Sequence, residues 1–73
     1  MSSNISIIEG TITNELNIVL PNCVIKIDEI NPATNAINII GYVITDINGY
    51  YSFALEANEN YIYELSIFPP LGL

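Results

Sequence analysis

The most constraining feature of this chain is the segment TDINGYYSFAL at residues 45–55. Asn48 and Gly49 are neighbouring residues that tolerate positive φ, which a two-residue hairpin turn requires. Large side chains alternate behind them, because Tyr51 and Phe53 share one face of an extended segment. The segment therefore predicts a strand, a tight turn and a second strand that pair as a β-hairpin.

Other segments with alternating apolar residues are separated by turn signals such as Pro21-Asn22 and Asn31-Pro32. No segment has the period of an amphipathic helix. The expected strands are residues 5–13, 23–28, 37–45, 50–55 and 61–67, with a short sixth at 18–20. Short strands at this spacing predict one small all-β domain, a sandwich or a barrel.

The apolar content is high for so short a chain. Hydrophobic residues make up 51% of the 73 residues, and charged residues only 12%. The single cysteine, Cys23, excludes an internal disulfide. A domain of this size cannot bury so much apolar surface in its own core. Another chain is therefore expected to cover part of that surface.

The charge is strongly acidic. Eight acidic residues stand against Lys26, and the net charge is −7. This excludes nucleic acid and anionic membrane surfaces, which both select for clusters of cations. Neither a signal peptide nor a membrane-spanning segment is apparent. We expect synthesis in the cytoplasm, followed either by use there or by release without a cleaved signal into a spore-surface, phage or other extracellular assembly.

Four motifs follow one another along the chain: Ile8-x-Gly10-x-Ile12, Leu20-Pro21-Asn22-Cys23-x-Ile25-x-Ile27, Thr45-Asp46-x-Asn48-Gly49-Tyr50-Tyr51-x-Phe53-x-Leu55, and Tyr61-x-Tyr63-x-Leu65. Over residues 8–67 they resemble the carboxypeptidase regulatory-like domain. That family is a transthyretin-like (prealbumin-like) β-sandwich related to the repeat domains of Gram-positive surface adhesins. The resemblance implies an Ig-like sandwich of about six or seven strands and a non-enzymatic module used in adhesion, stalks or assembly. It makes the following residues turn or core positions: Gly10, Asp46, Asn48, Gly49, Tyr51, Phe53 and Tyr61.

The chain departs from the related isopeptide-forming adhesins. Those domains carry a lysine in the first strand, whereas Lys26 lies in the second expected strand. Their final strand is missing as well, because the sequence stops at Leu73. An intramolecular isopeptide bond is therefore not expected.

The missing strand leaves an open sheet edge, which can pair with another chain. We expect an N-terminal arm at residues 1–7, followed by a single domain at 8–73, and we expect the arm to add to a neighbour's open edge. Repeated head to tail, this contact builds a filament. The chain is thus predicted to be a homo-oligomer or polymer forming a fibre, appendage or surface layer. Its predicted assembly residues are outward apolar side chains: Ile5, Ile7, Val24 and Ile62, with Ile39 or Ile44.

Catalysis has little support, because the chain contains no histidine or arginine. No cofactor is expected. A calcium loop would use Asp46 and Asn48 with help from Asp28 and Glu29, but Asp46 and Asn48 offer only two ligands and no bidentate glutamate follows. We therefore expect them to be turn residues and expect no metal. Cys23 is expected to be buried, the alternatives being an intermolecular disulfide or a reactive thiol.

The alternative function is a monomeric adhesion or accessory module that binds a carbohydrate or a protein. It would use an outward patch of Tyr42 and Tyr50. The other tyrosines, Tyr51, Tyr61 and Tyr63, are expected to point inward.

Overall fold

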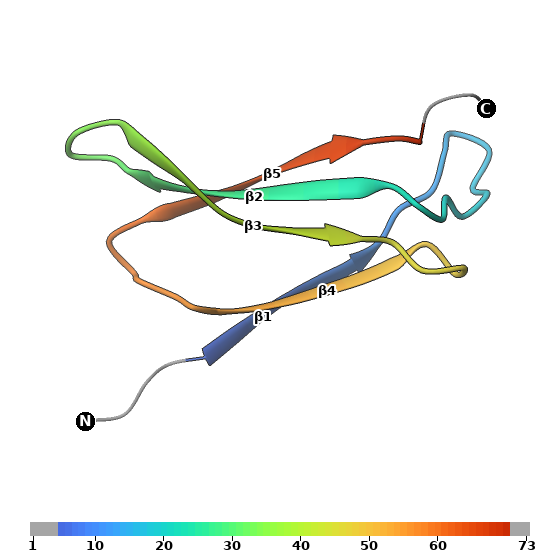
Figure 1. Cartoon of the computed structure of the whole chain (residues 1–73), viewed down its shortest axis with the longest axis horizontal. Helices are drawn as coiled ribbons and strands as arrows, with labels where there is room; N and C mark the ends of the chain where they lie inside the picture. Colours follow the sequence, from blue (N-terminus) through green and yellow to red (C-terminus); the bar gives the residue numbers. More distant parts are fainter. Residues whose placement is uncertain (1–4, 71–73) are drawn as a thin grey trace.

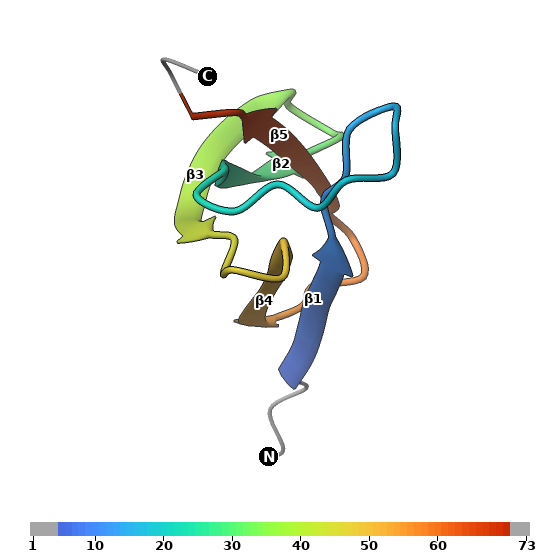
Figure 2. The same cartoon turned by 90° about the vertical axis from the view of Figure 1, so that its right-hand side faces the viewer.

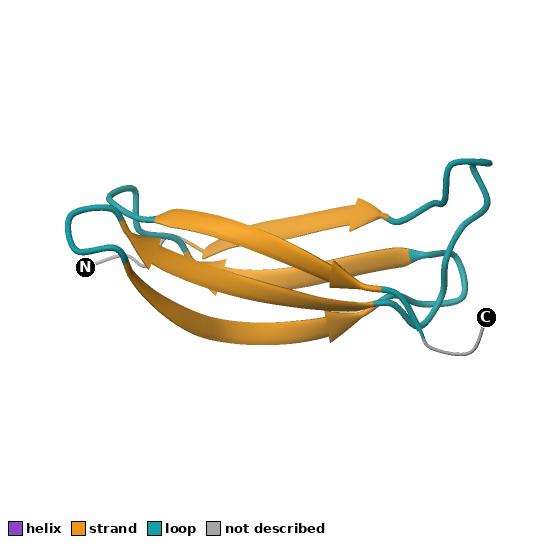
Figure 3. Cartoon of the chain, turned by 90° about the horizontal axis from the view of Figure 1, so that it is seen from above, coloured by secondary structure: helices purple, strands orange, loops and turns teal. Residues whose placement is uncertain are grey.

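The protein, described for residues 5–70 by a computed structural model, is a small all-β sandwich (Figure 1). One sheet pairs β1 with β4, and the other has the order β3-β2-β5; all pairs are antiparallel. The strands run along the length of the molecule, with loops gathered at the two ends (Figure 3). The five strands are β1 Ile5–Thr11, β2 Val24–Asn31, β3 Ala36–Ile44, β4 Tyr50–Glu56 and β5 Ile62–Phe68.

The predicted all-β sandwich is confirmed, with five strands among residues 5–70 where six or seven were expected. Residues 18–20 do not form a strand and contribute only an isolated bridge between Thr13 and Val19. Tyr61 lies just before β5, not inside it. The part of the chain that the structure describes contains no helix long and apolar enough to cross a membrane.

The predicted hairpin at residues 45–55 is wrong. The turn itself exists, since Gly49 has a φ of 74° and its N–H donates to the Asp46 carbonyl at 2.9 Å. The two flanking strands, however, enter different sheets: β3 pairs with β2, and β4 pairs with β1. The turn is therefore the corner at which the chain crosses between the two layers.

The core lies between the two sheets. Cys23, Ile25 and Ile27 point inward from the β2 segment and are at most 1% exposed, and Leu55 from β4 is 9% exposed. Phe53 packs across the core against β3 at Gly41, where an added Cβ would lie 2.5 Å from its ring. The β2–β3 register shifts beside Gly41, between Ile27 and Asp28.

Two polar contacts anchor the loop between β1 and β2. The buried Thr45 hydroxyl donates to the Leu20 carbonyl at 2.7 Å and accepts the Cys23 N–H at 2.9 Å. The Asn14 side chain closes the preceding turn by accepting the N–H groups of Leu16 and Ile18. The buried Thr45 contacts hold the long connection against the end of the sandwich.

The boundary of the N-terminal arm differs from the expectation. Residues 5–7 are the first part of β1 and lie opposite residues 54–56 of β4. They are therefore part of the domain and not free to act as an arm. Residues 1–4, the rest of the expected arm, fall outside the described residues.

Candidate assembly surfaces

The first candidate surface is the open edge of β1. Within residues 5–70, β1 pairs with β4 alone. The Ile12 N–H donates to the Gly49 carbonyl at 2.8 Å, and backbone groups alternate in direction along an antiparallel strand. The even-numbered residues of β1 therefore direct their backbone groups at β4. The odd-numbered residues, from Ile5 to Thr11, direct theirs at the open edge.

This edge has few of the features that block strand addition. Residues 5–11 contain neither proline nor lysine, and their only charged side chain is Glu9. Ile5 and Ile7 lie beside the edge on the outer face of the sheet and are about 60% exposed. The edge therefore combines unpaired backbone groups with apolar side chains that a neighbouring strand would cover.

A second open edge belongs to β5. The Thr45 N–H donates to the Cys23 carbonyl, so odd-numbered residues at the start of β2 face β3 and the even-numbered ones face β5. On β5 this leaves the backbone groups of Tyr63, Leu65 and Ile67 at the edge. The edges of β1 and β5 lie on the same side of the sandwich (Figure 2). Ile67 has an inward register but is 47% exposed there, so the core is incompletely covered on that side.

The third candidate surface is the side of the β3–β2–β5 sheet that points away from the β1–β4 sheet. We call this surface the outer face. Each of its ends is a row of three apolar residues that lie side by side on β3, β2 and β5. The large side chains on the edge strands are between 50% and 62% exposed. The end rows are Ile44, Val24 and Phe68 at one end, and Ile37, Ile30 and Ile62 at the other.

The middle of the outer face is polar. Its two rows are Tyr42, Lys26 and Ser66, followed by Ile39, Asp28 and Glu64. The Lys26 ammonium lies 3.6 Å from Asp28 Oδ2. The Asp28 side chain is 7% exposed, and its Oδ1 has no hydrogen-bond partner. Asp28 and Glu64 are direct cross-strand neighbours, and like charges in that position destabilise a sheet.

The predicted assembly residues do not form one surface. Ile5 and Ile7 belong to the outer face of the two-stranded sheet, whereas Val24 and Ile62 occupy opposite ends of the outer face defined above. Ile39 and Ile44 are both exposed on the outer face. Sequence alternation thus placed these side chains outward but could not assign them to a sheet.

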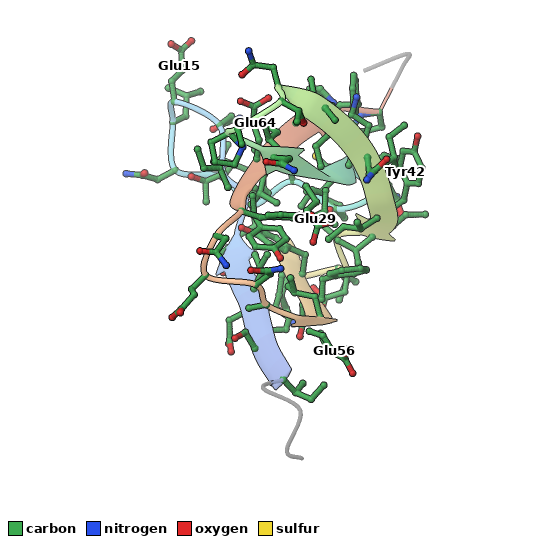
Figure 4. All side chains as sticks on the ribbon, turned by 90° about the vertical axis from the view of Figure 1, so that its left-hand side faces the viewer. Glu15, Glu29, Tyr42, Glu56 and Glu64 are labelled. Carbon is green, nitrogen blue, oxygen red and sulfur yellow. The ribbon has the colours of Figure 1, made fainter. Side chains whose placement is uncertain are left out.

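The two tyrosines that the alternative binding function would use are also separated. Tyr42 projects from β3 on the outer face (Figure 4). Tyr50 lies on the β1–β4 sheet and points away from the core. Its hydroxyl donates to Glu9 at 2.9 Å, and this hydrogen bond raises the pKa of the phenol. The two rings therefore face opposite sides of the sandwich and cannot line one sugar site.

The motif residues are engaged in turn and core contacts. Asp46 Oδ1 accepts the N–H groups of Asn48 and Tyr50 at 2.8 and 3.0 Å, so it caps the turn that calcium ligation would have used. Gly10 leaves room for the Tyr51 hydroxyl, which would lie 2.8 Å from an added Cβ. Among residues 5–70, no group of three or more His, Cys, Asp or Glu side chains is placed to hold a metal ion.

A polar depression lies at the end of the sandwich near the β4–β5 loop. Tyr63 makes two hydrogen bonds there: its hydroxyl donates to Glu29 at 2.8 Å and accepts the Asn58 N–H at 3.0 Å. Burial, followed by the bond to Glu29, raises the pKa of this phenol above its usual 10.0. The depression is lined by Ser6, Glu29, Glu56, Ala57, Asn58, Glu59, Asn60, Tyr61 and Tyr63. It offers acidic and amide groups but no histidine or cysteine for nucleophilic chemistry.

Comparison of the chain with models of known protein families, with curated proteins and with solved structures finds no match.

Proposed function

We propose that this chain is a non-enzymatic structural subunit that self-assembles, with the open edge of β1 as its main contact. The observation that carries the proposal is the set of unpaired backbone groups between Ile5 and Thr11, flanked by exposed apolar side chains. Addition of a neighbour's strand satisfies those backbone groups and covers Ile5 and Ile7. The product would be a fibre, appendage or surface layer such as a spore coat or phage structure.

The small size of the core supports the proposal. Only four hydrophobic residues are classed as buried among those described: Cys23, Ile25, Ile27 and Leu55. Fourteen large hydrophobic side chains among the described residues are exposed. A chain that leaves so much surface exposed gains stability when copies cover one another.

A distant relationship to carboxypeptidase regulatory-like domains is part of the proposal. Two facing antiparallel sheets and a Gly-containing corner between them are consistent with such a module. The contact differs from the one expected from sequence, because residues 5–7 already pair with β4. The neighbour would therefore add to an edge of the folded domain, without exchange of residues 5–7.

The test is negative-stain electron microscopy combined with light scattering on the untagged chain. Wild-type protein should form ordered filaments or sheets. Ile7→Pro should prevent them, because proline removes an N–H that faces the open edge while the bonds to β4 use the neighbouring residues. Ile7→Thr is the matched control, since it keeps the N–H and strand propensity.

The contradictory result would be wild-type protein that stays a monodisperse monomer of 8.1 kDa at every concentration. That outcome would favour the alternative function, a monomeric module that binds a carbohydrate or a protein. Filaments that persist in Ile7→Pro, with unchanged circular dichroism, would show that assembly does not use the edge of β1.

A further inference from the structure

We propose that the outer face of the β3–β2–β5 sheet packs against the same face of a second copy, about a two-fold axis that crosses the strands at right angles. This inference rests on the proposed self-assembly and adds a second contact surface to it. The occupant is another copy of this chain because the pattern of apolar and charged rows on the face is complementary to itself.

The order of the rows determines the arrangement. Along β2 the rows are apolar at Val24, basic at Lys26, acidic at Asp28 and apolar at Ile30. A two-fold axis across the strands reverses this order in the second copy, so each apolar row meets an apolar row and the basic row meets the acidic row. An axis along the strands would instead place each Lys26 opposite the other and would bring the acidic rows together, which is unfavourable.

The charges of the single chain point to the same partner. Lys26 is the only lysine or arginine of a chain with net charge −7, and it lies in the middle of this face. Asp28 and Glu64 are directly opposite on β2 and β5, and the Lys26 ammonium pairs with Asp28. In the two-fold arrangement the Lys26 of the second copy lies opposite this pair, where the exposed Glu64 carboxylate can accept it.

The area of the face limits the strength of this contact. Seven residues of three strands span about 24 by 14 Å, or roughly 340 Å² in projection. A stable dimer typically buries about 800 Å² on each partner. The face contact is therefore weak alone and acts together with the β1 edge, which lies on another side of the molecule (Figure 2). Two different contacts on each copy extend into an open chain and not a closed dimer.

The decisive variant is Glu64→Lys, with Glu56→Lys as its matched control. Both change the net charge equally, but Glu56 lies on the other sheet, away from the outer face (Figure 4). Glu64→Lys places a lysine beside the Asp28 that faces the Lys26 of the second copy, twice in each two-fold contact. It also removes a like-charge neighbour of Asp28, so the single chain should become more stable while the contact weakens.

The measurement is sedimentation velocity in the Ile7→Pro background, where edge pairing is blocked. We expect a concentration-dependent dimer whose dissociation constant rises about tenfold with Glu64→Lys. Glu56→Lys should leave it unchanged or lower it, because general repulsion falls. Lys26→Glu combined with Glu64→Lys should restore the dimer, since the two charges are exchanged. In the wild-type background, Glu64→Lys should shorten filaments and Glu56→Lys should not.

The outcomes separate the two proposals. Wild-type protein that is monomeric overturns both. Filaments that require the β1 edge but respond equally to Glu64→Lys and Glu56→Lys overturn the face contact and leave the proposed function intact. A short bifunctional thiol cross-linker gives the orientation: it should join Ile37→Cys to Ile44→Cys protein in a mixture. Cross-linking of either variant only to itself would contradict the proposed axis.

Discussion

The two faces of the β3–β2–β5 sheet are made from similar residues, but one face is buried and the other is exposed to solvent. The inner face carries Ile25 and Ile27, which are at most 1% exposed, whereas Ile37 and Ile44 on the outer face are each 62% exposed. Isoleucine is equally apolar in both places. Their exposure differs because the β1–β4 sheet covers the inner face and leaves the outer face open (Figure 2). Apolar alternation therefore marks surfaces to be covered, without stating by which chain.

The largest expected effect comes from a matched pair of substitutions on the two faces. Ile25→Ala should lower the free energy of unfolding by about 2–5 kcal/mol, because it leaves a cavity in the core. Ile44→Ala should change it by less than about 0.5 kcal/mol in the monomer. Urea unfolding at low protein concentration measures both.

The control for this comparison is protein concentration. At concentrations where copies associate, Ile44→Ala should become more destabilising, and Ile25→Ala should keep its effect. Equal losses for the two variants in dilute solution would show that the outer face is already covered within one chain.

A smaller effect is expected at the polar end of the inner face, at Thr45. Thr45→Val keeps the shape but removes the hydroxyl that bonds Leu20 and Cys23. The buried Cys23 N–H and the partly buried Leu20 carbonyl would lose their partner, and stability should fall by about 1–3 kcal/mol. Thr45→Ser keeps the hydroxyl and should lose less. A larger loss for Thr45→Ser than for Thr45→Val in thermal unfolding would indicate that the methyl group, and not the hydrogen bonds, matters at this position.

The smallest effect is expected at the other end, where Tyr63 bonds Glu29. The pKa of Tyr63 is raised in the folded state, so the folded protein holds the phenol proton more tightly than the unfolded chain does. This contribution to stability is present below the usual tyrosine pKa of 10.0 and is lost as the pH rises through the folded-state value.

Tyr63→Phe should therefore flatten the alkaline part of a stability profile recorded above about pH 9. Tyr42→Phe is the control, because no hydrogen bond of the Tyr42 hydroxyl is recorded in the structure and its side chain is exposed. If the stability profile of Tyr63→Phe is as steep as that of the wild type, other groups cause the loss of stability at alkaline pH.

The turn at residues 46–49 shows how far local chemistry can be read. Asn48-Gly49 correctly predicts a turn with positive φ at Gly49. It does not predict whether the flanking strands pair, because that depends on which other strands compete for their edges. Here β2 takes the edge of β3 and β1 takes the edge of β4, so the turn becomes a corner. Thr45, whose buried hydroxyl anchors that corner, has no signal in the sequence beyond its position before the turn.

For the candidate surfaces, too, the sequence predicts the local direction of a side chain but not the partner of its strand. Alternation alone placed Ile7, Val24 and Ile62 on outward positions, and the structure agrees. Tyr42 and Tyr50 were grouped in one patch because both are outward, yet they face opposite sides of the molecule. A period of two residues reports the face of a strand relative to its neighbours in the chain, but not which sheet the strand joins.

The features that could be read from the sequence are local: an all-β chain, the phase of each strand, the turn at Gly49, an acidic surface and more apolar residues than one small core can hold. The pairing of the strands, the open edges and the order of the rows on the outer face became visible only in the folded protein. These depend on contacts between residues far apart in the chain, where several pairings satisfy the same local preferences. The observed pairing brings Phe53 against Gly41 and buries the Thr45 hydroxyl against Leu20, and neither contact is local in the chain.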